Sequence, residues 1–396
     1  MKLNDVCEFI IDCPHSTAKD EGKGYPLIRT PNIGKGRLIL DGVYRVSDTV
    51  YKSRIQRGVP QDGDLIFARE APAGNVAIIT NGEKVCLGQR TVLIRPNKSL
   101  VDAKWLVYYL LSPQKQYDLL GTANGATVAH VNLPTIRNLN IKLPDMVIQN
   151  KIASILSTYD DLIENNRCQI ALLEEAASRL YKEWFVDFHF PGHEQVKIVD
   201  GVPEGWSKKQ LCEIATIFSG YPFSSKTMNK EGKYKIITIK NIQDGRLDSS
   251  SVDCIDSIPD NMPDYCKLNE KDILLSMTGN VGRVCIFFGK NCLLNQRVAK
   301  ITGSNLGYLY CLFRSPDMYN KICNLSNGVA QQNLSLTRIR KTQILFPAKN
   351  IREVFEKNII PMINQILTVS KQNRLLQEAR DRLLPKLMNG EIEVRP

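Results

Sequence analysis

The chain has 396 residues, of which 43% are hydrophobic and 23% are charged, a balance typical of a globular protein. No apolar run approaches the roughly 20 residues of a membrane span, and the first residues do not form a signal peptide. There is no Cys-x-x-Cys pair and none of the four histidines lies near a cysteine pair, which disfavours a zinc site. We therefore expect a cytoplasmic protein with free thiols and no bound metal.

The sequence contains one pattern twice. In the later part of each half the second copy follows the first by 203 positions, and in the earlier part by 207 to 209 positions. An offset that drifts and then becomes constant indicates variable loops followed by a segment without insertions. The chain therefore consists of two domain-sized halves. The matched segments are 124–126 with 327–329, 172–176 with 375–379, Gln89-Arg90 with Gln296-Arg297, Asp64 with Asp272, and 25 and 32–33 with 234 and 241–242.

The first part of each half is predicted to form a compact domain with both strands and helices. Short β-like runs are separated by glycine, proline and asparagine turns. A short helix follows and ends before a Ser-Pro pair, and the second half repeats it at 309–313. In the first half the expected elements are strands at 25–29, 64–68, 76–79 and 92–94, and a helix at 105–111.

The second part of each half is predicted to form one long helix. Ten positions in each copy recur at alternating spacings of four and three, the pattern of a coiled-coil seam. Each helix would have roughly 36 residues, with Asp145 and Asn350 as N-caps and Asn389-Gly390 as a stop. Pro361 and Pro385 predict a kink or break in the second helix. The seam positions are Ile152, Leu156, Tyr159, Ile163, Asn166, Ile170, Leu173, Ala177, Leu180 and Trp184, and Phe355, Ile359, Met362, Ile366, Val369, Asn373, Leu376, Arg380, Leu383 and Leu387.

The two asparagines of the seam predict its register. If the helices pair antiparallel in full overlap, with Trp184 opposite Phe355, then Asn166 faces Asn373 and the two amides satisfy one another. The same alignment places Arg380 against Tyr159, where it could stack or extend outward. A parallel pairing would leave both amides against apolar residues. The alternative is two amphipathic helices, each packed on its own domain.

The net charge of +11 is unevenly spread. Residues 204–396 carry 28 Lys and Arg against 18 Asp and Glu, while residues 1–203 are nearly balanced. No acidic residue lies between Asp118 and Asp145 or between Asp317 and Glu353, and these windows match at offset 203. Exclusion of acids at equivalent places favours a surface that faces phosphates, although such patterns also arise by chance composition.

Motifs for chemistry are missing. The sequence lacks a phosphate-binding loop, a complete glycine-rich dinucleotide motif, the Asn/Asp-Pro-Pro-aromatic run of base-amine methyltransferases, and a serine or cysteine nucleophile with a histidine partner. Glu21-Gly22-Lys23 and Glu231-Gly232-Lys233 are similar to the end of a nuclease motif, but polar turns before strands explain them better. The sequence therefore indicates a binding protein.

These features together resemble the specificity (S) subunits of type I restriction-modification systems. The order of domain, long helix, domain and long helix is the same, and the likeness covers essentially the whole chain. The chain departs from the family pattern at Val128-Ala129-His130 and at the starts of both long helices (144–149 and 347–352), where the usual Pro-rich motif is reduced. The segments that carry the likeness are 63–69, 181–188, 203–206, 327–334 and 383–392.

The resemblance implies an α+β fold with an internal pseudo-two-fold repeat, in which two target recognition domains are joined by two long helices in an antiparallel coiled coil. It implies that the chain is not an enzyme and that it binds a bipartite, asymmetric site in double-stranded DNA. Two methyltransferase (M) subunits and restriction (R) subunits would be its partners, and S-adenosylmethionine, ATP and Mg²⁺ would be bound by them. The expected boundaries are 1–144 and 206–347 for the domains, 145–188 and 348–391 for the helices, and 189–205 for the linker.

The predicted DNA surface consists of the loops that follow equivalent strands in the two halves, together with the two acid-free windows. Arginine suits bidentate contact with guanine or phosphate. The alternative is that these side chains pair with nearby carboxylates. Other readings of the whole chain are a single-chain endonuclease or methyltransferase with fused recognition domains, and a coiled-coil scaffold that does not bind nucleic acid. The predicted DNA-binding residues are Arg29, Arg69, Asn75, Lys240, Arg283, Gln331, Arg338 and Arg340.

Overall fold

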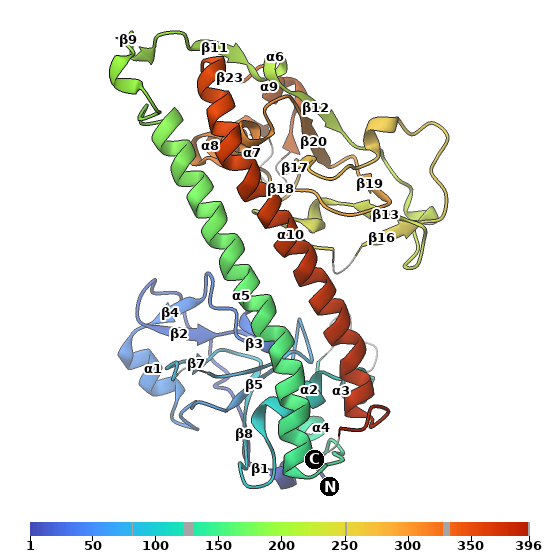
Figure 1. Cartoon of the computed structure of the whole chain (residues 1–396). Helices are drawn as coiled ribbons and strands as arrows, with labels where there is room; N and C mark the ends of the chain where they lie inside the picture. Colours follow the sequence, from blue (N-terminus) through green and yellow to red (C-terminus); the bar gives the residue numbers. More distant parts are fainter. Residues whose placement is uncertain (81, 122–129, 250–251, 328–332, 395–396) are drawn as a thin grey trace. The chain divides into compact units, whose positions relative to one another are not determined.

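The computed structural model describes the chain except for residues 81, 122–129, 250–251, 328–332 and 395–396. The chain forms two compact units (Figure 1). Unit 1 comprises Met1–Glu164 together with Arg374–Pro396, and unit 2 comprises Asn165–Asn373. No helix in the described part of the chain is long and apolar enough to cross a membrane.

Two long helices contribute to both units. Helix α5 (Met146–Phe185, green in Figure 1) and helix α10 (Lys349–Met388, red) each have 40 residues. The first part of α5 and the last part of α10 belong to unit 1, and the remaining parts belong to unit 2. The helices are therefore antiparallel, as the register of the two asparagines predicts.

Unit 1 is built on a five-stranded sheet in the order β1-β8-β5-β6-β3. Its neighbours are antiparallel except β3 and β6, which are parallel. A second sheet has the order β4-β2-β7. The strands are β1 (Cys7–Asp12), β2 (Tyr25–Ile28), β3 (Gly36–Arg37), β4 (Tyr44–Val46), β5 (Leu65–Ala68), β6 (Val76–Ile78), β7 (Cys86–Leu87) and β8 (Thr91–Pro96), and the short helices are α1 (Asp48–Arg54), α2 (Ala103–Leu111), α3 (Pro113–Leu120) and α4 (Leu133–Arg137).

Unit 2 repeats this arrangement. Its main sheet has the order β12-β20-β17-β18 and its second sheet has the order β16-β13-β19. Three strand pairs, β11-β23, β14-β15 and β21-β22, complete it. The strands are β11 (Ser207–Gln210), β12 (Thr216–Ser219), β13 (Tyr234–Ile237), β14 (Ile242–Gln243), β15 (Arg246–Leu247), β16 (Asp253–Ile255), β17 (Ile273–Ser276), β18 (Val284–Ile286), β19 (Cys292–Leu294), β20 (Val298–Thr302), β21 (Ser326–Asn327) and β22 (Asn333–Leu334) with β23 (Gln343–Phe346), and the short helices are α6 (Leu211–Ile214), α7 (Leu306–Arg314), α8 (Pro316–Leu325) and α9 (Leu336–Arg340).

The segment between the two halves forms a short hairpin. Strand β9 (Ile198–Val199) pairs with β10 (Val202–Pro203) in an antiparallel manner. Gly201 between them has a φ of 74°, a left-handed conformation that glycine adopts without a steric penalty. The predicted linker therefore contains a tight turn within unit 2.

The predicted short elements of unit 1 are present with small shifts of their ends. Helix α2 begins where the Asp102 carboxylate accepts a hydrogen bond of 2.7 Å from the Trp105 backbone N–H, a side-chain N-cap. The next helix, α3, starts at Pro113, and its counterpart α8 starts at Pro316. Proline is favoured at this first helical position because the missing N–H has no partner there in any case.

The main core of unit 1 lies where the five-stranded sheet, α2 and the two long helices meet. Leu65 and Phe67 of β5, Trp105 of α2, Leu156 of α5 and Leu387 of α10 are all buried in one cluster. Unit 2 has an equivalent cluster that includes Tyr308 of α7, Trp184 of α5 and Phe355 of α10. In each unit the segments of α5 and α10 therefore pack on the sheet of that unit as well as on each other. The helix pairing and the packing of amphipathic helices on each domain are thus both present.

The predicted seam between the helices is confirmed. All twenty seam positions are buried or half-buried. The Trp184 and Phe355 rings are 5.5 Å apart between centroids, and Asn166 Nδ2 donates a hydrogen bond of 2.9 Å to Asn373 Oδ1. In unit 1, Ile152 and Leu387 share the same core. The antiparallel register predicted from the asparagines is therefore correct.

Three details of the helix prediction are wrong. The expected break is absent, because helix α10 continues through Pro361 and Pro385; Ile359 and Ile363 beside the exposed Pro361 are fully buried and hold the helix in place. Asn350 lies inside α10, which begins at Lys349, and so does not cap it. Arg380 does not stack on Tyr159: it forms ion pairs with Asp160 and Asp381, because a buried guanidinium is best stabilised by a carboxylate.

Candidate functional site

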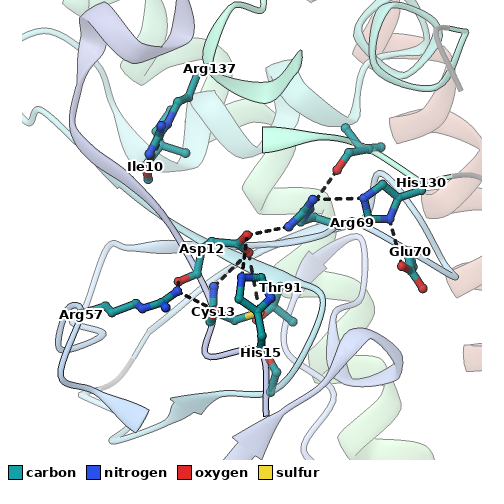
Figure 2. A network of polar contacts seen from close by, with 12 residues as sticks. Ile10, Asp12, Cys13, His15, Arg57, Arg69, Glu70, Thr91, His130 and Arg137 are labelled. Atoms are coloured by element: carbon teal, nitrogen blue, oxygen red, sulfur yellow. Dashed lines mark hydrogen bonds and ion pairs between the residues drawn. The ribbon is translucent and has the colours of Figure 1, made fainter. Parts of the chain in front are cut away.

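The central strands of the unit 1 sheet meet at one edge. Strand β1 ends at Asp12, which pairs with Val92, and β5 ends at Ala68, which pairs with Thr91 at the start of β8. The loops that follow or precede these strand ends therefore lie side by side. Figure 2 shows polar residues of this edge, among them Asp12, His15, Arg69, Glu70 and His130.

A pocket of about 270 Å³ lies at this edge. Its lining residues all have polar or charged side chains and come from four separate segments of the chain. Such a surface presents hydrogen-bond donors and acceptors in a fixed arrangement. The lining residues are His15, Arg69, Glu70, Gln89, Arg90 and His130.

Arg69 is the centre of the network in Figure 2. Its guanidinium lies 2.6 Å from an Asp12 carboxylate oxygen, donates to the Val131 carbonyl at 2.9 Å and lies 3.0 Å from His130 Nε2. The side chain is only 12% exposed. Arg69 therefore joins the end of β1 to the segment around His130, and this in-chain role accounts for most of its hydrogen-bonding capacity.

Glu70 and Arg90 form the outer part of the same network. His130 Nδ1 lies 2.9 Å from one Glu70 carboxylate oxygen, and Arg90 pairs with the other. Glu70 is 19% exposed and Arg90 is 63% exposed. The Arg90 backbone has a φ of 64°, which is unusual for a residue with a Cβ atom. A fixed acid and an exposed arginine are thus held together at the sheet edge.

Unit 2 has the same frame with different side chains. The Arg69 N–H donates to the Arg90 carbonyl at 2.9 Å, and likewise the Met277 N–H donates to the Arg297 carbonyl at 3.0 Å. The Glu70–His130 pair corresponds to Thr278 and Asn333, whose side chains are joined at 3.1 Å between Oγ1 and Oδ1. The exposed Gln296-Arg297 pair repeats Gln89-Arg90. The two edges therefore share an arginine and differ in the groups around it.

The comparisons with known proteins decide the family. The model of the type I restriction modification DNA specificity domain matches residues 1–175 and again residues 203–377. The chain belongs to this family. The expected fold class and the expected role as a DNA-specificity subunit rather than a catalytic one are thereby confirmed.

Individual relatives agree with this assignment. This specificity subunit is 31% identical to the MjaIX type I restriction enzyme specificity subunit of Methanocaldococcus jannaschii, over 99% of this chain and 93% of the relative. It is 25% identical to the HindI specificity subunit of Haemophilus influenzae, over 83% of this chain and 86% of the relative. Its fold is similar to the S subunit from M. genitalium, with a TM-score of 0.54 at 16% identity, over 98% of this chain and 95% of that chain.

Arg340, predicted to contact DNA, has a structural partner in this specificity subunit. It follows Ile339 at the end of α9 and donates to the Ile217 carbonyl of β12. Arg137 at the end of α4 does the same in unit 1, donating to the Ile10 carbonyl of β1 at 2.5 Å. This matched pair fixes the helix before the long helix to the first strand of each sheet. Arg137 and Arg340 both lie in acid-free windows, and both thus stabilise the fold.

Other predicted residues also have partners within their units. Arg29 lies 3.4 Å above the Tyr44 ring, Asn75 donates to the Ile33 carbonyl at 2.9 Å, and Arg283 donates to Gln243 at 2.8 Å. In the second acid-free window, Lys321 pairs with Asp317 at its edge. The contacts of Arg29, Asn75 and Arg283 hold loops that follow strands, whereas the Lys321–Asp317 pair lies within helix α8.

Lys240 and Arg338 are exposed, and Arg338 makes a long contact of 3.5 Å to the Leu325 carbonyl. Gln331 lies outside the described residues. The structure thus brings Arg69 to the strand edge of unit 1, while the other predicted residues lie on separate loops or helices. Sequence reasoning missed Glu70, Arg90, His130 and Arg297 as site residues, although the repeated Gln-Arg pair was a signal for two of them.

The described part of the chain contains no cluster of side chains suited to a metal ion. No group of three or more His, Cys, Asp or Glu side chains there could hold an ion. All eleven cysteines are free thiols. Burial raises the pKa of the Cys86 thiol to about 11, so it stays protonated and unreactive at neutral pH. The strand edges are suited to recognition.

Proposed function

We propose that each unit of this specificity subunit reads one half of a bipartite DNA site through its strand edge. The observation that carries this proposal is the pair of matched edges, which share a Gln-Arg dipeptide with an exposed arginine but differ in the surrounding groups. A shared frame gives both edges the same approach to DNA, and different side chains give different base preferences. Such a pair of readers fits an asymmetric site. We assign the reading to residues 1–144 and 206–347.

Base contacts and phosphate contacts fall to different residues in this proposal. Arg90 and Arg297 are exposed at the edges and are suited to the two acceptors of guanine. Lys240 and Arg338 are exposed on neighbouring segments and are suited to phosphates. Four predicted residues have partners within the chain, namely Arg29, Asn75, Arg283 and Arg340. We therefore assign them first to holding their segments in place, and Arg69 has the same role at the pocket. Gln331 is retained as a contact from its sequence position alone.

The long helices, within residues 145–188 and 348–391, are the proposed docking site for two methyltransferase subunits. Leu172 of α5 is 66% exposed, and Leu375 of α10, its equivalent 203 positions later, is 56% exposed. Leu162 on α5 is also exposed, but Gln365 lies at its equivalent position. The same apolar side chain presented twice suits two copies of one partner.

The remaining partners and cofactors follow from this assembly. Restriction subunits would join the complex of this chain with the methyltransferase subunits. S-adenosylmethionine, ATP and Mg²⁺ would be bound by those partners and not by this chain. The free thiols of the chain suit a reducing compartment, and we place the complex in the cytoplasm.

The proposal is tested by mapping methylated bases. The chain is expressed with its methyltransferase subunit in a host without methylation, and methylated positions are mapped across the genome. The expected result is one bipartite motif with two different halves. Arg90→Ala should relax one half and Arg297→Ala the other. A motif with one continuous block, or relaxation of both halves by a single substitution, would contradict the proposal.

A second experiment separates this role from a single-chain enzyme. The purified chain alone is incubated with DNA, S-adenosylmethionine, ATP and Mg²⁺. No methylation or cleavage is expected, since the sequence lacks the motifs for either reaction. Activity without partners would favour the single-chain alternative.

A further inference from the structure

The acid at the unit 1 edge has a fixed position. Glu70 directly follows Arg69, whose backbone N–H and carbonyl are both bonded, to the Arg90 carbonyl at 2.9 Å and to the Val131 N–H at 2.9 Å. Its carboxylate is held by His130 on one oxygen and by Arg90 on the other. A carboxylate can accept about four hydrogen bonds. These two partners therefore orient the group while leaving capacity to accept from a ligand.

Arg90 is held in an uncommon backbone conformation beside it. A left-handed φ in a residue other than glycine is stabilised only where surrounding contacts fix it, and such positions cluster at binding sites. Here the Arg90 carbonyl accepts from the Arg69 N–H, and the next carbonyl, of Thr91, accepts from the Cys13 N–H at 3.1 Å. The side chain remains 63% exposed. The backbone is fixed and the guanidinium is presented outward.

Unit 2 lacks the acid in the same frame. Thr278 takes the place of Glu70 and Asn333 takes the place of His130. Arg297 is not among the described residues with a positive φ. The two edges thus differ in charge at one equivalent position, beside an arginine that both have.

We propose that Glu70 and Arg90 together read a single C·G base pair in the half-site bound by unit 1. In the major groove a guanine presents two adjacent acceptors, N7 and O6, and its cytosine presents the N4 amino donor beside them. Arg90 donates to the guanine acceptors and Glu70 accepts from the cytosine amino group. An A·T pair has its donor between two acceptors, so it cannot satisfy a bidentate arginine with an adjacent carboxylate. This assignment rests on the proposed function.

Unit 2 reads its equivalent position differently. Thr278 is uncharged and buried, and its hydroxyl donates to Asn333 Oδ1 at 3.1 Å, so it does not require the cytosine amino group. Glu70 is thereby a specificity-determining residue of the first half-site alone. The base-pair requirement at this position is one source of the asymmetry between the two halves.

The test uses the complex of the full chain with its methyltransferase subunits. Its motif is first mapped, and binding is then measured by fluorescence anisotropy on duplexes in which each base pair is replaced in turn. For wild type we expect one C·G pair of the first half-site to be preferred by roughly 5- to 150-fold over the other pairs. Glu70→Gln and Arg90→Ala should each abolish this preference and leave the second half-site unchanged. Thr278→Val is the matched control and should leave the first half-site unchanged.

The outcomes distinguish this inference from the function on which it rests. If wild type shows no sequence preference at all, the proposed function fails. If wild type recognises a bipartite motif but its first half has no C·G pair, or if discrimination at that pair survives both Glu70→Gln and Arg90→Ala, the assignment of Glu70 and Arg90 is overturned. Glu70→Gln keeps the size of the side chain, and circular dichroism verifies that each variant is folded.

Discussion

Asn166 and Asn373 are joined side chain to side chain, with 2.9 Å between the amide nitrogen of the first and the amide oxygen of the second. They lie in a seam whose other positions in unit 2 are mostly apolar, and Asn373 is only 8% exposed. A slipped alignment would place each amide against a hydrocarbon side chain. The pair therefore favours one register of α5 against α10, at some expense in stability.

This pair gives a first prediction about stability. Asn373→Leu removes the partner of the Asn166 amide and should lower the free energy of unfolding by about 1–3 kcal/mol. Replacing both residues by leucine should restore the stability or exceed it, because two apolar groups then meet. Urea unfolding followed by circular dichroism measures both effects. A single variant as stable as wild type would show that the amide pair does not set the register.

A second prediction separates the two arginines of α9. Arg340→Ala removes the donor to the Ile217 carbonyl and should destabilise unit 2 by about 1.5–3 kcal/mol. Arg137→Ala should have the same effect on unit 1. Arg338→Ala should instead weaken binding of the assembled complex to all DNA sequences equally and reduce its salt dependence by about one phosphate contact. Thermal unfolding and binding titrations at several salt concentrations distinguish the two roles. Unchanged DNA affinity of Arg338→Ala would remove it from the DNA surface.

A third prediction concerns the exposed leucines of the long helices. Leu172→Asp or Leu375→Asp should each reduce the number of bound methyltransferase subunits from two to one, and the double variant should bind none, because a charge cannot enter an apolar contact without a large desolvation cost. Native mass spectrometry counts the subunits. Leu162→Asp is the matched control, since Leu162 is exposed on the same helix without an equivalent leucine. Loss of assembly in this control would argue against the paired sites.

A fourth prediction follows from a buried acid in unit 2. Burial raises the pKa of Glu174 above its usual 4.5, although Arg314 and Tyr310 beside it act in the opposite direction. The folded state then binds the proton more tightly than the unfolded state. Stability contributed by the protonated form is present below pH 4.5 and is lost as pH rises through the raised pKa, with a slope of up to about 1.4 kcal/mol per pH unit.

Glu174→Gln should abolish this part of the pH dependence. Its amide oxygen can still accept from the Tyr310 hydroxyl, which bonds to Glu174 in the wild type. The free energy of unfolding of wild type minus that of the variant should therefore fall as pH rises above 4.5. Denaturant titrations across this range measure the difference. A difference that rises with pH would mean that the ion pair with Arg314, 3.0 Å away, outweighs burial.

The long helices could be predicted because their pattern is local and regular. The seam positions from Ile152 to Trp184 follow one another at regularly alternating spacings of four and three, so burial of one predicts burial of the next. To predict antiparallel pairing, one further fact was needed, namely that the two asparagines of the seam, Asn166 and Asn373, must face each other. The ion pair of Arg380 with Asp160 escaped this reasoning, because a neighbouring position on the helix offered a better partner than the seam itself.

The strand edge could be predicted only in part. Asp12, Arg69, Arg90 and His130 are far apart in the sequence and are brought together by antiparallel pairing of β1, β8 and β5. No periodicity connects them, and the intervening loops differ in length between the halves. The repeated Gln-Arg pair marked equivalent positions in the two halves, whereas the exchange of Glu70–His130 for Thr278–Asn333 depends on strand pairing that the sequence pattern does not specify.

The division of the chain has a consequence for biosynthesis. Unit 2 is one continuous segment, whereas unit 1 needs residues 374–396 as well as 1–164. Leu387, buried with Leu156 and Trp105, leaves the ribosome after the whole of unit 2. The unit 1 sheet is therefore synthesised before unit 2 but completed after it, and a truncation before residue 374 would damage unit 1 while leaving the segment of unit 2 intact.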